Sequence, residues 1–162
     1  MLPPGLTARL SLALDHGQFL VLDRDAIVDD DAYTEAVQRV GLAQFDGGIA
    51  VFTESMWTKG TRVRIRLSES RPTVDVSRRN HAVLGGFVCP SGEIRAFSPE
   101  GTGSHEQRLS LPIGTYGVIV CGDGFGSTDE RSANGEDSYE LLLWPADELP
   151  APRCLKQGLP ES

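Results

Sequence analysis

The chain has 162 residues, of which 40% are hydrophobic and 23% are charged. This composition is typical of a globular protein with a single domain over residues 1–162, and it excludes a disordered, collagenous or coiled-coil chain. The 15 basic and 23 acidic residues give a net charge of −8, which disfavours direct binding to nucleic acid or to an anionic membrane. A basic protein or a metal ion is the kind of partner that this charge favours.

The cysteines and the first residues of the chain predict a cytoplasmic protein. Cys89, Cys121 and Cys154 are odd in number and lack a CxxC or Cys/His ligand spacing, so we expect reduced thiols. The segment 1–5 has neither the basic region nor the apolar core of a signal peptide. No apolar run reaches the roughly 20 residues that a membrane-spanning helix needs.

Most segments alternate between apolar and polar residues, which is typical of half-buried strands. The alternation is clearest over 61–67, where Val63, Ile65 and Leu67 alternate with three arginines. Shorter β patterns occur at 10–14, 18–22, 49–52, 74–76, 82–89, 93–98, 109–111, 116–120 and 139–144. Eight or nine strands at this spacing predict an all-β fold, an antiparallel β-sandwich with its core at about 6–146 and a loose tail at 147–162.

Tight turns and one helix complete the predicted order of elements. Turns at 15–17, 90–92 and 112–114 contain the glycine or proline that such turns require, and they predict three β-hairpins. A short helix is predicted over 32–40, after the first hairpin. The aspartates at 29–31 would cap its N-terminus, and Gly41 would take the left-handed conformation that ends it.

Few residues have the spacing of a catalytic or metal site. His16, His81 and His105 are not spaced as a metal pair, and no Gly-x-Ser-x-Gly nucleophile elbow is present. We therefore expect no enzyme activity and no cofactor, although a catalytic set could still assemble in space. The acidic residues of the strand-free stretch 122–138 could ligate calcium, but they lack the EF-hand pattern.

Charge is segregated along the chain. Residues 59–79 contain seven basic and two acidic residues, and this net charge of +5 leaves −13 on the remainder. The three arginines at 62, 64 and 66 are expected to face solvent and to pair with acids on a neighbouring strand. Acidic residues concentrate at 23–31 and at 123–140.

The second acidic stretch is not followed by a helix, so helix capping does not explain it. Clustered carboxylates on projecting loops attract a cationic partner and mimic a phosphate backbone. Tyr33, Trp57 and Phe125 could add apolar anchors if they are exposed. We therefore predict a partner-binding surface made of Asp29, Asp30, Asp31, Asp46, Asp123, Asp129, Glu130, Glu136 and Asp137.

Several short motifs, in this order and spacing, resemble the ComJ-type competence proteins, which are inhibitors of a DNA-entry nuclease. The resemblance extends over 10–146 and rests on Leu10-Ser11-Leu12, Gln18-Phe19, Thr34-Glu35-Ala36, Gly41-Leu42-Ala43, Asp46-Gly47-Gly48-Ile49, Arg66-Leu67-Ser68, Leu109-Ser110-Leu111-Pro112-x-Gly114-x-Tyr116 and Asp137-Ser138-Tyr139. It implies a non-enzymatic inhibitor or immunity-type partner of a bacterial nuclease, with a basic active-site groove as the target. A sandwich module that binds calcium or carbohydrate in its end loops is the alternative.

Overall fold

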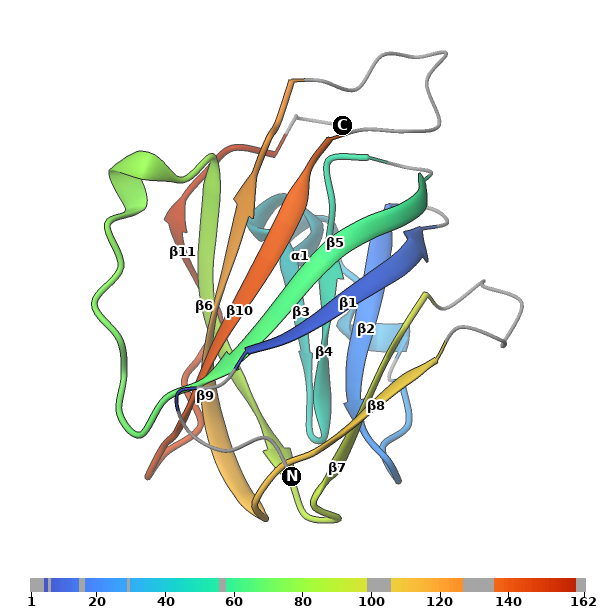
Figure 1. Cartoon of the computed structure of the whole chain (residues 1–162), viewed down its shortest axis with the longest axis vertical. Helices are drawn as coiled ribbons and strands as arrows, with labels where there is room; N and C mark the ends of the chain where they lie inside the picture. The colour runs from blue at the N-terminus through green and yellow to red at the C-terminus, as the bar shows by residue number, and fades with distance from the viewer. Residues whose placement is uncertain are drawn as a thin grey trace.

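A computed structural model describes residues 5, 7–14, 17–28, 30–55, 58–98, 106–126 and 136–159, with the backbone alone described for Asp30 and Lys59. Within these residues the chain forms eleven strands, two 3-10 turns and a short α-helix (Figure 1). In chain order the elements are β1 (Thr7–Leu14), β2 (Gln18–Asp23), η1 (Asp30–Ala32), α1 (Glu35–Val40), β3 (Leu42–Phe45), β4 (Gly48–Phe52), β5 (Thr58–Leu67), η2 (Val76–Arg78), β6 (His81–Cys89), β7 (Glu93–Phe97), β8 (Gln107–Ser110), β9 (Gly114–Asp123), β10 (Ser138–Pro145) and β11 (Arg153–Lys156).

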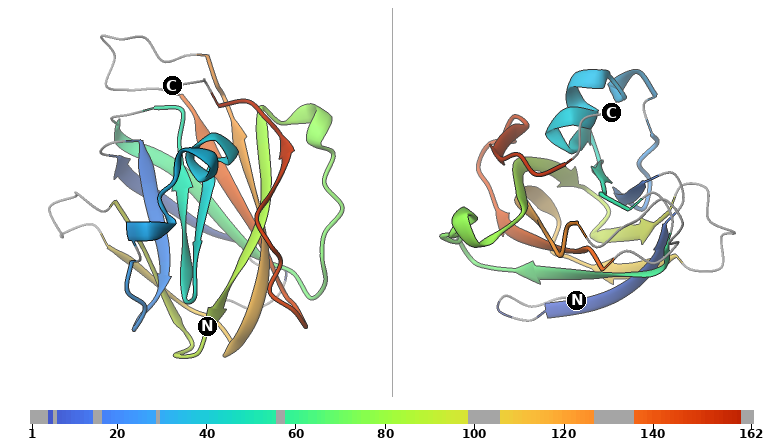
Figure 2. Two further views of the ribbon diagram at one scale, coloured as in Figure 1. Left: turned by 180° about the vertical axis from the view of Figure 1, so that it is seen from behind. Right: turned by 90° about the horizontal axis from the view of Figure 1, so that it is seen from above.

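The strands form two sheets that pack face to face, as the view from above shows (Figure 2). One sheet has six strands in the order β1-β5-β10-β9-β6-β11, and the other has five in the order β3-β4-β2-β7-β8. The predicted all-β sandwich is therefore confirmed, with more strands than the eight or nine expected. The pairing is antiparallel throughout except between β5 and β10, which run parallel.

Alternation along the strands fills the space between the sheets. On β5, Val63, Ile65 and Leu67 are at most 1% exposed and belong to the central apolar cluster. Arg62, Arg64 and Arg66 of the same strand are exposed on the outer face. Burial of one face against the other sheet is the main stabilising contribution here, because apolar area leaves water only on that face.

The three predicted hairpins are wrong, because each turn joins strands of different sheets. β1 lies in the six-stranded sheet and β2 in the five-stranded one, and the same holds for β6 with β7 and for β9 with β8. The segment formed by β6 and β7 runs antiparallel to the segment formed by β8 and β9, with β6 paired to β9 and β7 paired to β8. Both segments bend where they pass from one sheet to the other. At the bend the Leu111 N–H donates to the Gly92 carbonyl at 2.9 Å, and Gly92 has φ +80°. Strands that change sheets in this way form the corners of a sandwich.

The short helix is confirmed, but its N-terminal cap is not the one predicted. Thr34 is the cap, because its hydroxyl accepts the Val37 N–H at 3.2 Å. Gly41 ends the helix with φ +97°, as expected. Apolar residues before and within the helix pack on the outer face of the five-stranded sheet, where they cover a second apolar cluster that includes Leu20, Phe45 and Ala50; they are Ala26, Val28, Ala32, Tyr33 and Val37.

Two segments on the other outer face differ from prediction. Val74 and Val76 do not form a strand, since Asp75 caps the 3-10 turn η2 there. Residues 153–156, predicted to lie in a loose tail, pair with β6 as the edge strand β11. Both segments cover a third apolar cluster on the outer face of the six-stranded sheet, which includes Ile119, Leu142 and Trp144. This covering explains why apolar residues also occur at outward positions of β9 and β10.

Candidate functional site

The acidic residues predicted to bind a partner lie in three places. Asp30 and Asp31 belong to η1, on the outer side of the five-stranded sheet (Figure 2). Asp46 lies in the turn between β3 and β4. Asp123, Glu136 and Asp137 come together where β9 ends and β10 begins. Asp29, Asp129 and Glu130 lie outside the described residues.

Asp46 and Asp123 lie at opposite ends of the sandwich. The Asp46 carbonyl accepts the Val88 N–H at 3.1 Å, next to the end of β6 where Cys89 opposes Gly114. Asp123 opposes Ser138 at the far end of β9. The predicted carboxylates therefore do not share one face, and a single contact surface can include only part of the set.

Asp137 is in the interior, 3% exposed, and its carboxylate binds the connection between β4 and β5. The backbone N–H of Ser55 donates to Asp137 Oδ2 at 3.1 Å, and the Ser55 hydroxyl donates to Oδ1. The Tyr139 hydroxyl donates to Oδ2 at 2.6 Å. Because these donors use the carboxylate inside the protein, Asp137 supports the site and does not face a partner.

Tyr139 connects Asp137 to Glu54, the residue that precedes Ser55 in the connection between β4 and β5. Its hydroxyl oxygen accepts the Glu54 N–H at 2.7 Å. Burial raises the pKa of Tyr139, and the neighbouring carboxylate of Asp137 raises it further. The phenol thus stays protonated and keeps donating to Asp137 over the whole physiological pH range.

The remaining contacts close the base of the acidic connection between β9 and β10. The Glu54 carboxylate accepts the Gly126 N–H at 2.9 Å, and the Asn80 side chain accepts the Phe125 N–H at 3.0 Å. Gly124 has φ +74°, and a Cβ there would lie 2.5 Å from the Glu136 carbonyl oxygen. The two arms of the connection are therefore held together at their base.

Asp123 is partly neutralised by an arginine. Arg79 donates to Asp123 Oδ2 at 2.6 Å and to Glu140 Oε1 at 2.8 Å, and Arg64 lies 3.4 Å from Glu140. Burial alone would lower the pKa of Arg79, but the hydrogen bonds to Asp123 and Glu140 outweigh it and raise the pKa. The prediction that the arginines of 61–67 pair with acids on a neighbouring strand holds for Arg64.

His81 is a structural anchor that its position in the sequence did not reveal. It is 2% exposed, its Nε2–H donates to the Val40 carbonyl at 2.9 Å, and its Nδ1 accepts the Gly158 N–H at 3.0 Å. Burial lowers the pKa of His81, which keeps the ring neutral and suited to this pair of bonds. The ring also stacks on Phe125 with centroids 6.4 Å apart. His16 and His105 lie outside the described residues.

The predicted aromatic anchors are placed differently from one another. Tyr33 packs between Phe45 and Phe52, with ring centroids 5.8 Å from each, and it is half-buried. Phe125 is half-buried against His81 and Tyr139. Trp57 lies outside the described residues. Phe125 is thus the aromatic residue that stands beside the acidic connection.

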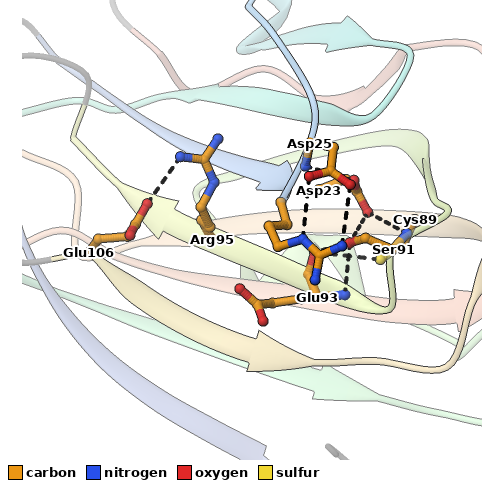
Figure 3. A network of polar contacts seen from close by, with 8 residues as sticks. Asp23, Asp25, Cys89, Ser91, Glu93, Arg95 and Glu106 are labelled. Atoms are coloured by element: carbon orange, nitrogen blue, oxygen red, sulfur yellow. Dashed lines mark hydrogen bonds and ion pairs between the residues drawn. The ribbon is translucent and has the colours of Figure 1, made fainter.

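A second buried aspartate, which sequence reasoning did not single out, lies at the opposite end of the sandwich (Figure 3). Asp23 is 1% exposed and accepts the Ser91 hydroxyl at 2.7 Å, the Ser91 N–H at 3.0 Å and the Asp25 N–H at 3.0 Å. Burial alone would raise the pKa of Asp23, but these hydrogen bonds together lower it. Cys89 beside it is buried, and burial raises the pKa of its thiol to about 11.

In the part of the chain that the structure describes, no three His, Cys, Asp or Glu side chains converge as metal ligands would. Two of the acidic residues considered for calcium, Asp129 and Glu130, lie outside that part. Across the described residues, no helix is long and apolar enough to span a bilayer.

Comparison with known proteins places this architecture in one class, the two-sheet fold of the ComJ-type proteins. No family model matches the chain, and no curated protein sequence matches it. Among solved structures, the chain is similar to ComJ from Bacillus subtilis, an inhibitor of the DNA-degrading activity of NucA. The TM-score is 0.65 and the identity 20%, over 90% of this chain and 99% of ComJ. It is also similar to the product of crocagin biosynthetic gene J, with a TM-score of 0.60 and 16% identity over 86% of this chain and 97% of that one. The resemblance predicted from the motifs is confirmed at the level of the fold.

Proposed function

We propose that this protein is a non-enzymatic inhibitor, or immunity-type partner, of a bacterial nuclease, and that it acts in the cytoplasm. The observation that carries the proposal is the match to ComJ over almost the whole of both chains. Inhibition of a DNA-degrading activity is what is stated for ComJ. The net charge of −8 supports a partner with a basic groove of the kind that binds DNA.

The acidic connection between β9 and β10 is the contact that the geometry favours. Its base is fixed by the contacts of Asp137, Tyr139 and Glu54, so that ordering the base adds no entropic cost on binding. Asp129, Glu130 and Glu136 would then compete with the phosphates of the nuclease substrate, while Asp123 is held at the rim by Arg79. Carboxylates presented together also raise the association rate with a cationic partner.

Asp30 and Asp31 of η1 and Asp46 of the turn between β3 and β4 are secondary in this proposal, because they belong to other parts of the fold, and Asp29, next to Asp30 in the sequence, is secondary with them. An enzymatic role has less support from the described residues. Ser55 and Asp137 are hydrogen-bonded, but both ring nitrogens of His81 are occupied by backbone groups, so this histidine does not activate the serine.

The test measures DNA degradation by a nuclease from the cells that make this protein, with NucA as a second target. Adding the wild-type protein should inhibit degradation of a labelled DNA duplex, and inhibition should weaken as salt is raised. A variant with Asp129→Asn, Glu130→Gln and Glu136→Gln should lose most of the inhibition, because the carboxylates that mimic phosphate are gone.

The matched control removes the same number of charges elsewhere, with Glu69→Gln, Asp147→Asn and Glu148→Gln, all at exposed positions. This control should inhibit as well as the wild type. Equal loss in both variants would show that net charge, and not the acidic connection, governs the contact. Absence of inhibition by the wild-type protein against both nucleases would contradict the proposed function.

A further inference from the structure

The outer face of the six-stranded sheet carries a basic furrow beside the proposed nuclease contact. Two depressions of about 430 Å³ and 310 Å³ follow one another along β5 and β10. Arg9, Arg62 and Arg64 line the first, while Arg66, Arg78 and Arg79 line the second. Asp75 and Glu140 are the acids among the lining residues, which leaves an excess of four positive charges.

The arrangement of these arginines works against the stability of the free protein. Arg9 of β1 and Arg64 of β5 are directly opposite each other in the antiparallel pair, and like charges in such positions repel. Within the described residues, Glu140 is the carboxylate that reaches Arg64, and it is also bound to Arg79. Arg9, Arg62 and Arg66 have no carboxylate at ion-pair distance in the same part of the chain. A strand with this cost is better explained by an anionic partner than by solubility alone.

The spacing of the charges fits an extended polypeptide. Alternate residues of a strand are about 6.6–6.8 Å apart, so Arg62, Arg64 and Arg66 form a row with this repeat. Alternate side chains of an extended peptide have the same repeat, and a peptide with an acid at every second position can match the row. Guanidinium groups bind carboxylates through two parallel hydrogen bonds, which favours arginine over lysine at such a site.

Nucleic acid fits the furrow less well. Stacking of bases needs exposed aromatic rings, and Tyr139, the aromatic residue of the lining, is 3% exposed. The net charge of −8 also repels a nucleic acid at long range. It repels a short acidic peptide less, because the peptide carries much less charge. Arginines of the furrow already bind one carboxylate of the protein itself, since Arg79 and Arg64 both pair with Glu140.

We propose that the row of Arg62, Arg64 and Arg66, together with Arg9, is a docking surface for an extended acidic segment of a partner protein. This surface borders the acidic connection between β9 and β10, because Ser138 and Tyr139 line its first depression, so separate substitutions are needed to distinguish the two contacts. The protein then has two faces of opposite charge, one for a basic nuclease groove and one for an acidic peptide.

The test is a fluorescence-anisotropy titration with the full-length protein at low ionic strength. The probe is a labelled decapeptide of alternating glutamate and threonine, with the glutamine–threonine decapeptide and a single-stranded thymidine decanucleotide as comparisons. The wild type should bind the acidic peptide more tightly than either comparison. The Arg62→Glu, Arg66→Glu double variant should weaken peptide binding by about tenfold or more.

The control changes the same charge at two exposed arginines away from the furrow, with Arg39→Glu and Arg153→Glu. This variant should change peptide affinity by less than about twofold. Equal weakening by the control variant, no binding of the acidic peptide, or tighter binding of the oligonucleotide would each overturn the proposal. The nuclease assay described above is independent of every one of these results.

Discussion

The two ends of the sandwich each contain a buried aspartate that holds a serine from a neighbouring connection. Asp23 accepts the N–H and the hydroxyl of Ser91, and Asp137 accepts the same two groups of Ser55. The ends differ in what the aspartate supports. Asp23 closes a corner of three residues between β6 and β7, whereas Asp137 closes the base of the acidic connection between β9 and β10. The same pair of hydrogen bonds therefore closes a corner of the sandwich at one end and, in the proposed function, holds the base of the acidic contact at the other.

The largest expected effect comes from removing each aspartate. Asp137→Ala removes the buried acceptor of the Ser55 and Tyr139 donors, and Asp23→Ala removes the buried acceptor of the Ser91 N–H. Each substitution should lower the free energy of unfolding by about 3 kcal/mol, as measured by urea denaturation. At a temperature where both variants are folded, only Asp137→Ala should also weaken nuclease inhibition. If Asp23→Ala weakens inhibition equally, the two ends do not have separate roles.

A smaller effect on the stability of the folded protein is expected when the pH is lowered and Asp23 is protonated. Hydrogen bonds hold the pKa of Asp23 below its ordinary value of 3.8, so the ionised form stabilises the folded state. This contribution is fully present above that value and is lost as the pH falls through the lower pKa of the folded state. Urea midpoints between pH 5 and pH 2.5 should therefore fall more steeply for the wild type than for Asp23→Asn. Parallel curves would contradict the assignment.

The smallest effect is expected at the other end, from His81. Burial lowers its pKa below 6.5, so protonation is easier in the unfolded state. The stability that depends on the neutral ring is present above pH 6.5 and decreases as the pH falls below it. Urea midpoints between pH 8 and pH 5 should show this decrease in the wild type and a flatter profile in His81→Gln. A steeper profile in the variant would show that another group titrates.

The elements that the sequence predicted well are those whose pattern is local. Alternation over 61–67 identified β5 and the direction of its arginines, and Gly41 identified the end of α1. The short turns at 15–17, 90–92 and 112–114 were wrongly predicted to form hairpins. The sequence of a short turn looks the same whether its two strands pair with each other or enter different sheets. The pairing partner is a tertiary property, and only the packing of both sheets decides it.

The candidate site was predicted in part for the same reason. The role of the acidic stretch 123–140 in partner binding stays a prediction, and the sequence does not show that Asp137 faces inward while Glu136 is exposed. Burial of Asp137 depends on Ser55, which lies 82 positions away in the chain. β11 was missed because it has four residues, of which Leu155 joins the outer apolar cluster, and so short a segment shows no clear alternation.

The parallel pairing of β5 with β10 also bears on how the protein is made. Val63 lies beside Tyr139, 76 positions later, so β5 leaves the ribosome long before this neighbour is synthesised. During that interval β1 is the neighbour already available to β5, and the other side of β5 offers unpaired peptide groups to any nascent chain close by. The like charges of Arg62, Arg64 and Arg66 disfavour pairing of this strand with a second copy of itself.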